Sequence, residues 1–333
     1  MNNKYTIAVD AMGGDEAPQC VVDGIKLFIA NDKQTQILLF GDEAAVMECF
    51  DGSLPDQVTS VHTDVQILNT EDPMKAIRLK ADSSLMMAIR AVKDGKADAL
   101  VSAGNTGAVM TGSLFTIGRR KGIHRPALTP ILPSKKGPTV LIDCGANAEC
   151  KPEHLVQFGL MGSVYSQYVL GVDNPPVGLL NIGSEPSKGN KLYKSVHKMM
   201  AEDKRFNFAG NIEARYALDG DIRVLVCDGF TGNIFLKTVE GTAMYMMSIM
   251  KQELSASFIR KIGTLLVMKG LKSMKKRLDY TETGGALLLG LENCVVKAHG
   301  SSTGKSFSSA LVQAKAVLDG DVVGIIKKAL AED

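Results

Sequence analysis

Two kinds of apolar pattern alternate along this chain. Short, mostly apolar runs, such as residues 36–41, 99–102 and 139–143, have the length of β-strands. Longer runs in which apolar residues recur every three or four positions, such as residues 153–170, predict amphipathic helices. Continuous apolar strands are typical of a sheet with helices on both faces. The alternation of the two patterns therefore predicts an α/β fold.

No proline- or serine-rich linker divides the 333 residues. We therefore expect residues 1–333 to form one interwoven domain, from which residues 244–278 protrude as an amphipathic helical segment. No apolar run reaches the roughly 20 residues that a membrane-spanning helix needs. The chain begins with Met-Asn-Asn-Lys followed at once by a strand pattern, so we expect no secretory signal.

Six predicted strands end in short polar, glycine-containing loops. The first reads Asp10-Ala-Met-Gly-Gly-Asp15, and its paired glycines allow a sharp turn and a close approach to a ligand. Ligands of open α/β sheets bind outside the carboxyl ends of the strands, so several of these loops can converge on one crevice. The loops supply Asp10, Gly13, Gly14, Asp15, Ser102, Gly104, Asn105, Thr106, Asp143, Asn147, Asn181, Ser184, Glu185, Asp228, Thr231, Asn233, His299, Ser301 and Ser302.

Two of these loops place Asn, Thr and Gly where a helix begins, at residues 105–107 and 231–233. Backbone amides at a helix N-terminus form an anion site, but Asn, Thr and Ser also cap helices without binding a ligand. Both interpretations stay open for one loop, whereas six such loops together favour a binding site. His299 is either a structural histidine or a general acid, general base or oxyanion donor.

Residues 254–278 differ from their surroundings because they hold seven Lys or Arg residues and no acidic residue. Phe258, Ile262 and Leu265 fall on one helical face, and the spacing suggests two short amphipathic helices hinged near Gly270. Such a segment can lie on an anionic membrane surface or form a subunit interface with a basic rim, to which Lys269 and Lys272 belong. Both interpretations remain open.

The remaining composition narrows the function. The formal net charge is only +2 and aromatic residues make up 5% of the chain, so we expect no nucleic-acid partner. The six cysteines are dispersed without a C-x-x-C pair, as in a cytoplasmic protein with reduced thiols. The sequence contains neither the phosphate-binding motif G-x-x-x-x-G-K-[ST] nor the dinucleotide-binding motif G-x-G-x-x-G after a strand. The spacing of its Asp and His residues matches no recognised metal site. We expect no cofactor and no metal.

Taken in order, the motifs resemble those of one family, the phosphate acyltransferases of bacterial phospholipid synthesis (fatty acyl-acyl carrier protein:phosphate acyltransferases). The motifs are AVDAMGGD at 8–15, SAGNTGA at 102–108, KPEHL at 151–155, MGSVY at 161–165, DGFTGN at 228–233 and KAHGSS at 297–302. They span nearly the whole chain, and six linked motifs in one order form a specific signature.

The resemblance implies an acyltransferase that moves a long acyl group from the thioester of acyl carrier protein to inorganic phosphate. The acyl phosphate would supply a membrane glycerol-3-phosphate acyltransferase. The resemblance also implies a homodimer, peripheral association with the membrane from the cytoplasm, and a three-layer α/β/α fold with a mostly parallel or mixed sheet. That fold would be akin to those of phosphotransacetylases and isocitrate dehydrogenases.

The site roles follow from loop position. Phosphate is already an anionic nucleophile, so the enzyme has to align it with the thioester and to stabilise the oxyanion that forms. We expect His299, Lys297, Asn105 and Asn233 to be catalytic. The residues expected to bind phosphate or the acyl donor, or to orient those that do, are Asp10, Gly13, Gly14, Asp15, Ser102, Gly104, Thr106, Asn147, Ser184, Asp228, Thr231 and Ser301.

Two rival functions remain open. A short-chain phosphotransacetylase that uses coenzyme A would have no role for the basic segment at residues 254–278. A non-catalytic scaffold for carrier protein at the membrane would tolerate substitutions in the strand-end loops.

Overall fold

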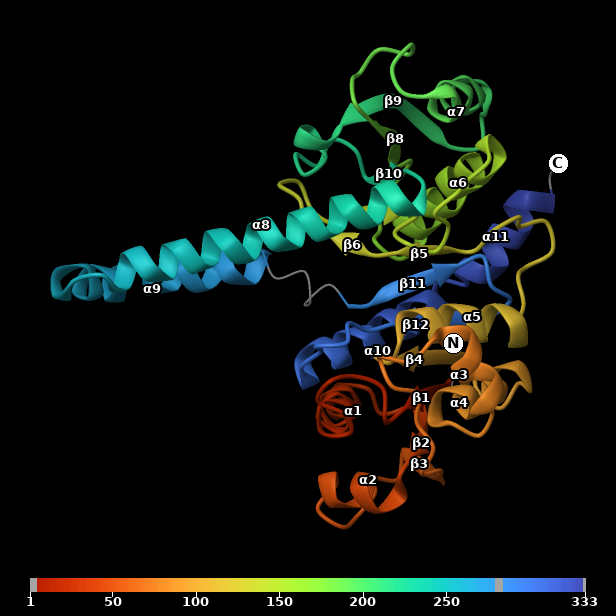
Figure 1. Cartoon of the computed structure of the whole chain (residues 1–333), viewed down its shortest axis with the longest axis vertical. Coiled ribbons are helices and arrows are strands. Elements are labelled where there is room, and N and C mark those ends of the chain that lie inside the picture. Colours follow the sequence, from red (N-terminus) through yellow and green to blue (C-terminus); the bar gives the residue numbers. More distant parts are fainter. Residues whose placement is uncertain (1–4, 279–283, 332–333) are drawn as a thin grey trace.

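The computed structural model describes residues 5–278 and 284–331 (Figure 1). Within these residues the strands form two mostly parallel sheets, and helices pack on them. The structure confirms the predicted α/β class. It also divides the strands between two sheets, which the sequence patterns do not indicate.

The first sheet has seven strands in the described residues, in the order β3-β2-β1-β4-β12-β11-β5. Strands β3, β2, β1, β4 and β12 run parallel, whereas β11 runs antiparallel to both its neighbours. The bounds are β1 Thr6–Asp10, β2 Gln36–Gly41, β3 Val58–His62, β4 Ala99–Ser102, β5 Ala127–Thr129, β11 Ala286–Leu289 and β12 Cys294–Lys297.

Helices cover both faces of this sheet because side chains alternate along its strands. In β1, Ile7 and Val9 belong to a buried cluster with residues of α1 and α10, whereas Ala8 belongs to another with residues of α4 and α5. The bounds on this side of the molecule are α1 Gln19–Asn31, α2 Glu43–Cys49, α3 Pro73–Leu79, α4 Ser84–Lys93, α5 Thr106–Thr116, α10 Gly304–Asp319 and α11 Val322–Ala331.

The second sheet has five strands in the described residues, in the order β6-β7-β10-β8-β9, and only β6 runs antiparallel. Helices α6 and α7 pack on it. The bounds are β6 Ile131–Leu132, β7 Thr139–Ile142, α6 Pro152–Tyr168, β8 Pro176–Asn181, α7 Lys191–Glu202, β9 Asn207–Glu213 and β10 Val224–Val226.

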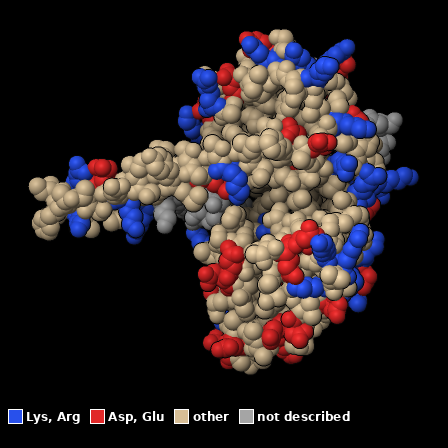
Figure 2. Space-filling model, viewed as in Figure 1, with Lys and Arg blue, Asp and Glu red and all other residues tan. Residues whose placement is uncertain are grey.

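Two long helices, α8 (Gly229–Ser255) and α9 (Phe258–Leu278), form a hairpin that projects from the rest of the molecule (Figure 1). The expected hinge at Gly270 is wrong, because α9 continues through that residue. A glycine inside a helix costs only about 1 kcal/mol, and a Cβ placed at Gly270 would meet no neighbouring atom. The break lies instead between Ser255 and Phe258. Figure 2 shows the hairpin as mostly uncharged surface with scattered Lys and Arg side chains.

Candidate functional site

A cleft of about 620 Å³ lies where loops from both sheets meet, a volume typical of small-molecule sites. The first sheet contributes the loops after β1, β4 and β12, and the second contributes the loop after β7 and the first turns of α8, which follows β10. Five of the six predicted loops therefore converge. The loop after β8 does not, since Ser184 is exposed and lies outside the cleft lining.

The predicted site residues divide into two groups. Those that line the cleft are Asp15, Gly104, Asn105, Thr106, Asn233, Lys297, His299 and Ser301. Those outside the lining, apart from Ser184, are Asp10, Gly13, Gly14, Ser102, Asn147, Asp228 and Thr231. The contacts of the second group connect the loops to each other and to the sheets.

Asp10, at the end of β1, is buried beneath the cleft. Its carboxylate accepts hydrogen bonds from the hydroxyls of Ser84 and Ser102, each at 2.7 Å, and Ser102 Oγ in turn accepts the backbone N–H of Gly104 at 3.0 Å. Burial raises the pKa of Asp10, and the two hydroxyls oppose that shift. Asp10 therefore ties the loop after β1 to the loop after β4.

Gly13 is fixed by close packing. A Cβ at this position would lie 2.5 Å from both Asp10 Oδ2 and the backbone N of Gly104. The next glycine, Gly14, has a φ of +118°, a backbone conformation that residues other than glycine rarely adopt. The paired glycines thus allow the loop to turn beneath the cleft and to present Asp15 at its surface.

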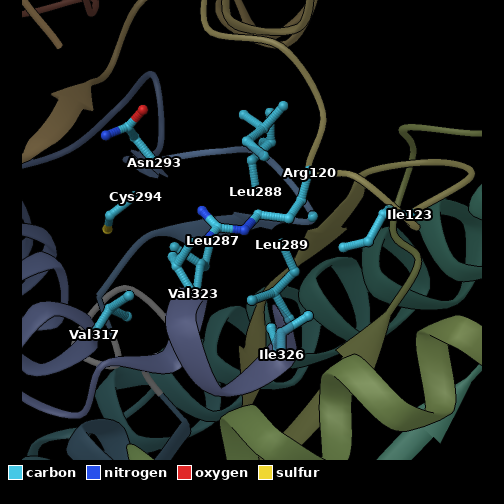
Figure 3. Close-up of a pocket in the computed structure, with 12 residues that line it drawn as sticks. Arg120, Ile123, Leu287, Leu288, Leu289, Asn293, Cys294, Val317, Val323 and Ile326 are labelled. Carbon is cyan, nitrogen blue, oxygen red and sulfur yellow. The ribbon is translucent and has the colours of Figure 1, made fainter. Parts of the chain in front are cut away.

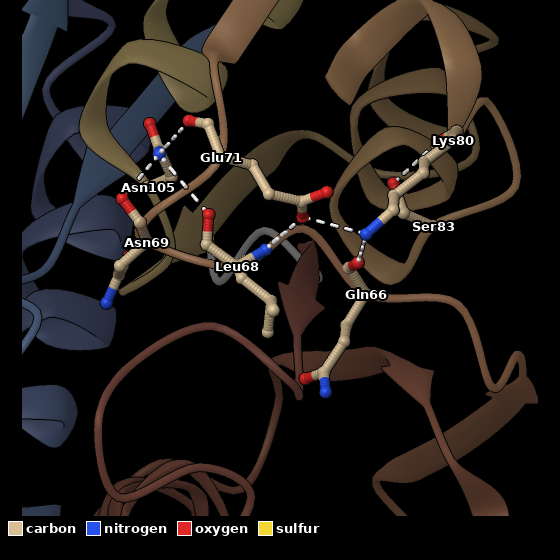
Figure 4. A network of polar contacts seen from close by, with 7 residues as sticks. All are labelled: Gln66, Leu68, Asn69, Glu71, Lys80, Ser83 and Asn105. Atoms are coloured by element: carbon tan, nitrogen blue, oxygen red, sulfur yellow. Dashed lines mark hydrogen bonds and ion pairs between the residues drawn. The ribbon is translucent and has the colours of Figure 1, made fainter. Parts of the chain in front are cut away.

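Asn105 caps α5 and also holds a neighbouring loop (Figure 4). Its Oδ1 accepts the N–H of Ala108 at 3.0 Å, while its Nδ2 lies within hydrogen-bonding distance of the carbonyls of Leu68, Asn69 and Glu71. Asn69 reaches across to donate to Asp15 Oδ1 at 3.0 Å. Residues 65–68 form irregular chain that leads to this loop.

Lys297 is buried at the end of β12 and reaches the cleft. Its Nζ donates to the carbonyl of Ala103 at 3.2 Å and to that of Ala298. Burial lowers the pKa of Lys297 from its ordinary value of 10.5 to about 8, although Asp10 and Asp15 act in the opposite direction. The ammonium is still mostly charged at pH 7, and its contacts anchor it to the cleft floor.

His299 also lines the cleft. Its Nδ1 accepts the backbone N–H of Ser301 at 3.2 Å and lies 2.8 Å from Ser301 Oγ. Burial and then Lys237 lower the pKa of His299 below its ordinary value of 6.5, so the neutral form of the ring predominates at pH 7. Since Nδ1 accepts a hydrogen bond, the proton of the neutral ring is on Nε2.

The second sheet holds its loops in a similar way. Asp143 is buried and accepts the N–H groups of Leu128 and Asn147 at 2.8 and 2.7 Å, and burial raises its pKa to about 6. Asn147 Nδ2 donates to Pro126 and to Asp143.

The start of α8 is held by Asp228. Asp228 caps α8 through Thr231, whose N–H and hydroxyl both donate to it. Asn233, one turn further along α8, lines the cleft.

The sequence motifs missed part of one wall of the cleft. Beyond the predicted Asn233, this wall is lined by Leu236, Lys237 and Glu240, which continue along the same helical face of α8. Lys237 Nζ lies 2.7 Å from Glu240 Oε2. The recurrence of residues every three or four positions along the predicted helix could have identified them. This pattern continues beyond the sequence motif, which ends at Asn233.

Another part of the lining is apolar. Leu128, Pro130 and Ile131, from the chain segment that links the two sheets, line the cleft together with Leu236 of α8. The polar groups at the start of α5 and along residues 297–301 line the same space. One cleft therefore offers sites for a charged group and for an aliphatic group.

The candidate contact residues of α9 belong to none of the buried core clusters in the described residues. The exposed fractions of Phe258, Ile262 and Leu265 are 78%, 49% and 69%, and Lys269 and Lys272 are also exposed. The half-buried positions of α9 are Thr264, Met268, Leu271 and Met274 on another face, and α9 contacts α8. The side chains of residues 275–278 lie outside the described part of the chain.

Three further observations concern a second cavity, metal binding and membrane-spanning helices. A second cavity, of about 10 Å³, lies among Arg120, Ile123 and the β11 segment (Figure 3) and has room for about one water molecule. Across the described residues, no cluster of three or more His, Cys, Asp or Glu side chains could hold a metal ion. None of the described helices is long and apolar enough to cross a membrane.

Comparison with known proteins decides the family. A family model described as "Fatty acid synthesis protein" matches residues 5–324. A protein named "Phosphate acyltransferase" from Thermoanaerobacterium thermosaccharolyticum is 47% identical over 97% of this chain and 96% of its own length. One of the same name from Clostridium perfringens is 44% identical over 98% and 97%. This chain belongs to the phosphate acyltransferase family. The resemblance inferred from the six motifs is thereby confirmed.

Solved structures confirm the fold of this phosphate acyltransferase family member. The chain resembles a phosphotransacetylase from Streptococcus pyogenes with a TM-score of 0.63 and 15% identity, covering 96% of this chain and 95% of the other. It resembles the EutD phosphotransacetylase from Staphylococcus aureus with a TM-score of 0.60 and 17% identity, covering 94% of each. At this level of identity the likeness concerns the fold alone.

Proposed function

We propose that the cleft transfers a long fatty acyl group from the thioester of acyl carrier protein to inorganic phosphate, giving acyl phosphate. Family membership supports an acyltransferase with phosphate as acceptor. The observation that carries the proposal is the division of the cleft. The start of α5, Lys297 and His299 offer donors to an anion, and Leu128, Pro130, Ile131 and Leu236 offer an apolar surface to an acyl chain.

A direct displacement fits these residues. An oxygen of phosphate attacks the thioester carbonyl, a C–O bond forms, the C–S bond breaks and the electron pair leaves with sulfur. Backbone amides at the start of α5 are suited to hold phosphate. In this proposal the Nε2–H of neutral His299 and the ammonium of Lys297, two residues of the cleft lining, stabilise the oxyanion. Alignment of the two substrates contributes several kcal/mol of the rate acceleration.

The α8–α9 hairpin bears on where the chain acts and on what it binds. We propose that the chain acts in the cytoplasm as a homodimer and binds an anionic membrane surface through the apolar and basic faces of α9. Its product would then form close to a membrane glycerol-3-phosphate acyltransferase. The exposure of Phe258, Ile262 and Leu265 beside Lys269 and Lys272 supports the membrane contact.

The decisive experiment incubates purified protein with labelled inorganic phosphate and long-chain acyl carrier protein, and measures labelled acyl phosphate. A parallel reaction supplies short-chain acyl-coenzyme A. We expect phosphate-dependent product from the carrier protein and much less from the coenzyme A thioester. The reverse preference would support a short-chain phosphotransacetylase, and no product from either donor would support the non-catalytic scaffold.

A further inference from the structure

The cleft holds two lysines in the described residues, and their surroundings differ. Lys297 is buried and donates to two carbonyls. Lys237 lies on the third turn of α8, which follows β10 of the second sheet, and its side chain is 57% exposed. Within the described structure, its ion pair with Glu240 uses one of the three N–H donors of the ammonium, which leaves two for a ligand.

Glu240 makes this arrangement specific. It is only 6% exposed, and a buried carboxylate requires a charged or hydrogen-bonding partner. Lys237 supplies that partner at 2.7 Å from one turn earlier on the same helix. The pair therefore fixes the direction of the lysine, which would otherwise sample many rotamers in solvent.

We propose that Lys237 binds the phosphate substrate in the cleft and that Glu240 is the positioning residue that holds it there. This inference rests on the proposed function. Asn233 and Lys237 reach the cleft from α8, while the start of α5 reaches it from the other sheet. Phosphate bound between them would bridge the two halves of the site. Burial is the main cause of the lowered pKa values of His299 and Lys297, and the charge of Lys237 adds to both shifts, in agreement with its position in the same cleft.

The test measures KM for phosphate, KM for the acyl donor and kcat in Lys237→Ala, Lys237→Arg and Glu240→Gln. A charge-assisted hydrogen bond predicts a rise in phosphate KM of about 10- to 100-fold in Lys237→Ala, with donor KM unchanged and partial rescue by Lys237→Arg. Lys251→Ala, an exposed lysine on the same helix outside the cleft lining, is the matched control. Unchanged phosphate KM in Lys237→Ala would overturn the inference.

A double variant tests the role of Glu240. Because Glu240 acts through Lys237, the phosphate KM of Lys237→Ala/Glu240→Gln should equal that of Lys237→Ala alone. If the effects of the two substitutions on phosphate KM add instead, Glu240 does not act through Lys237.

A binding assay separates this inference from the activity. Inorganic phosphate alone should raise the thermal midpoint of the wild type and of Lys251→Ala, and raise that of Lys237→Ala much less. Equal shifts in all three proteins would contradict the inference. Absence of acyl phosphate from the wild type would contradict the proposed function itself.

Discussion

Two buried aspartates, Asp10 and Asp143, occupy matching places at the ends of strands in the two sheets. Each accepts hydrogen bonds from groups in loops that surround the cleft, and burial raises the pKa of each. A buried carboxylate that meets several donors holds those donors strongly, because leaving any of them unpaired costs about 1–3 kcal/mol. These side chains therefore shape the cleft from beneath, and Asp15 is the acidic residue of the first loop at its surface.

Asn105 combines a structural and a functional role. Asn105→Ala should lower the free energy of unfolding by about 1 kcal/mol through loss of the cap, and should lower kcat/KM because the loop that carries Asn69 is released. Asn105→Asp is the matched variant. Its carboxylate can still accept the N–H of Ala108 but repels the carbonyls of Leu68, Asn69 and Glu71. We therefore expect activity to fall in both variants, and wild-type rates in Asn105→Asp would show that the loop is not needed. Urea unfolding and steady-state kinetics measure the two effects.

Lys297 predicts a specific pH dependence of stability. Its pKa is about 8 in the folded chain, against an ordinary value of 10.5, so between these pH values the unfolded chain binds a proton that the folded chain has lost. The free energy of unfolding therefore rises with pH across that interval, and the cost of burying the charge is fully present below pH 8.

Lys297→Met removes this dependence. Between pH 7.5 and 10.5 the stability of the wild type should rise relative to that of the variant by about 3 kcal/mol at most, measured by urea unfolding at several pH values. The other lysines titrate in both proteins, so their effect cancels in the difference between the two free energies of unfolding. Parallel pH profiles would show that the folded chain does not bury this charge as described.

At the scale of the element, the sequence predicted the strands that end in the cleft and the unusual character of α9. It placed the break at Gly270, whereas the chain breaks just before Phe258. Ser257 immediately precedes α9, and its Oγ accepts the N–H of Arg260 at 3.3 Å; a serine followed by an apolar run is a recognised start signal. Lys237 and Glu240 were missed for a related reason, since only the continuing period of α8 connects them to Asn233.

The exposed apolar face of α9 predicts binding to a membrane surface. Replacing Phe258, Ile262 and Leu265 with Ser should abolish sedimentation with anionic vesicles, because burial of each side chain contributes about 1.5–3 kcal/mol. Replacing Leu27, Tyr216 and Val312 with Ser is the matched control, since these side chains are also exposed but lie outside the hairpin. If both triple variants sediment like the wild type, α9 does not bind the membrane.

At the scale of the whole molecule, local patterns could not show how the strands divide. Strand β12 pairs with β4 in parallel, although Lys297 and its partner Ser102 are far apart in the sequence. The chain leaves the first sheet after β5, builds the second sheet and returns through the hairpin to β11 and β12. Such non-local pairing depends on packing and loop closure rather than on the period of any segment. The cleft is a consequence of this path, because it needs loops from both sheets.

The same path leaves a long part of α8 outside the body, and this predicts a second copy of the chain as its partner. Met244, Tyr245, Met246 and Ile249 are exposed, and residues 238–250 contain no Lys or Arg that could pair with lipid headgroups. An apolar surface without a basic rim suits a protein partner better than an anionic membrane. Tyr245→Asp/Ile249→Asp should therefore convert a dimer into a monomer in sedimentation velocity, whereas Lys251→Asp should remain dimeric. A dimer that persists in the double variant would place the subunit interface elsewhere, and a monomeric wild type would contradict the assembly itself.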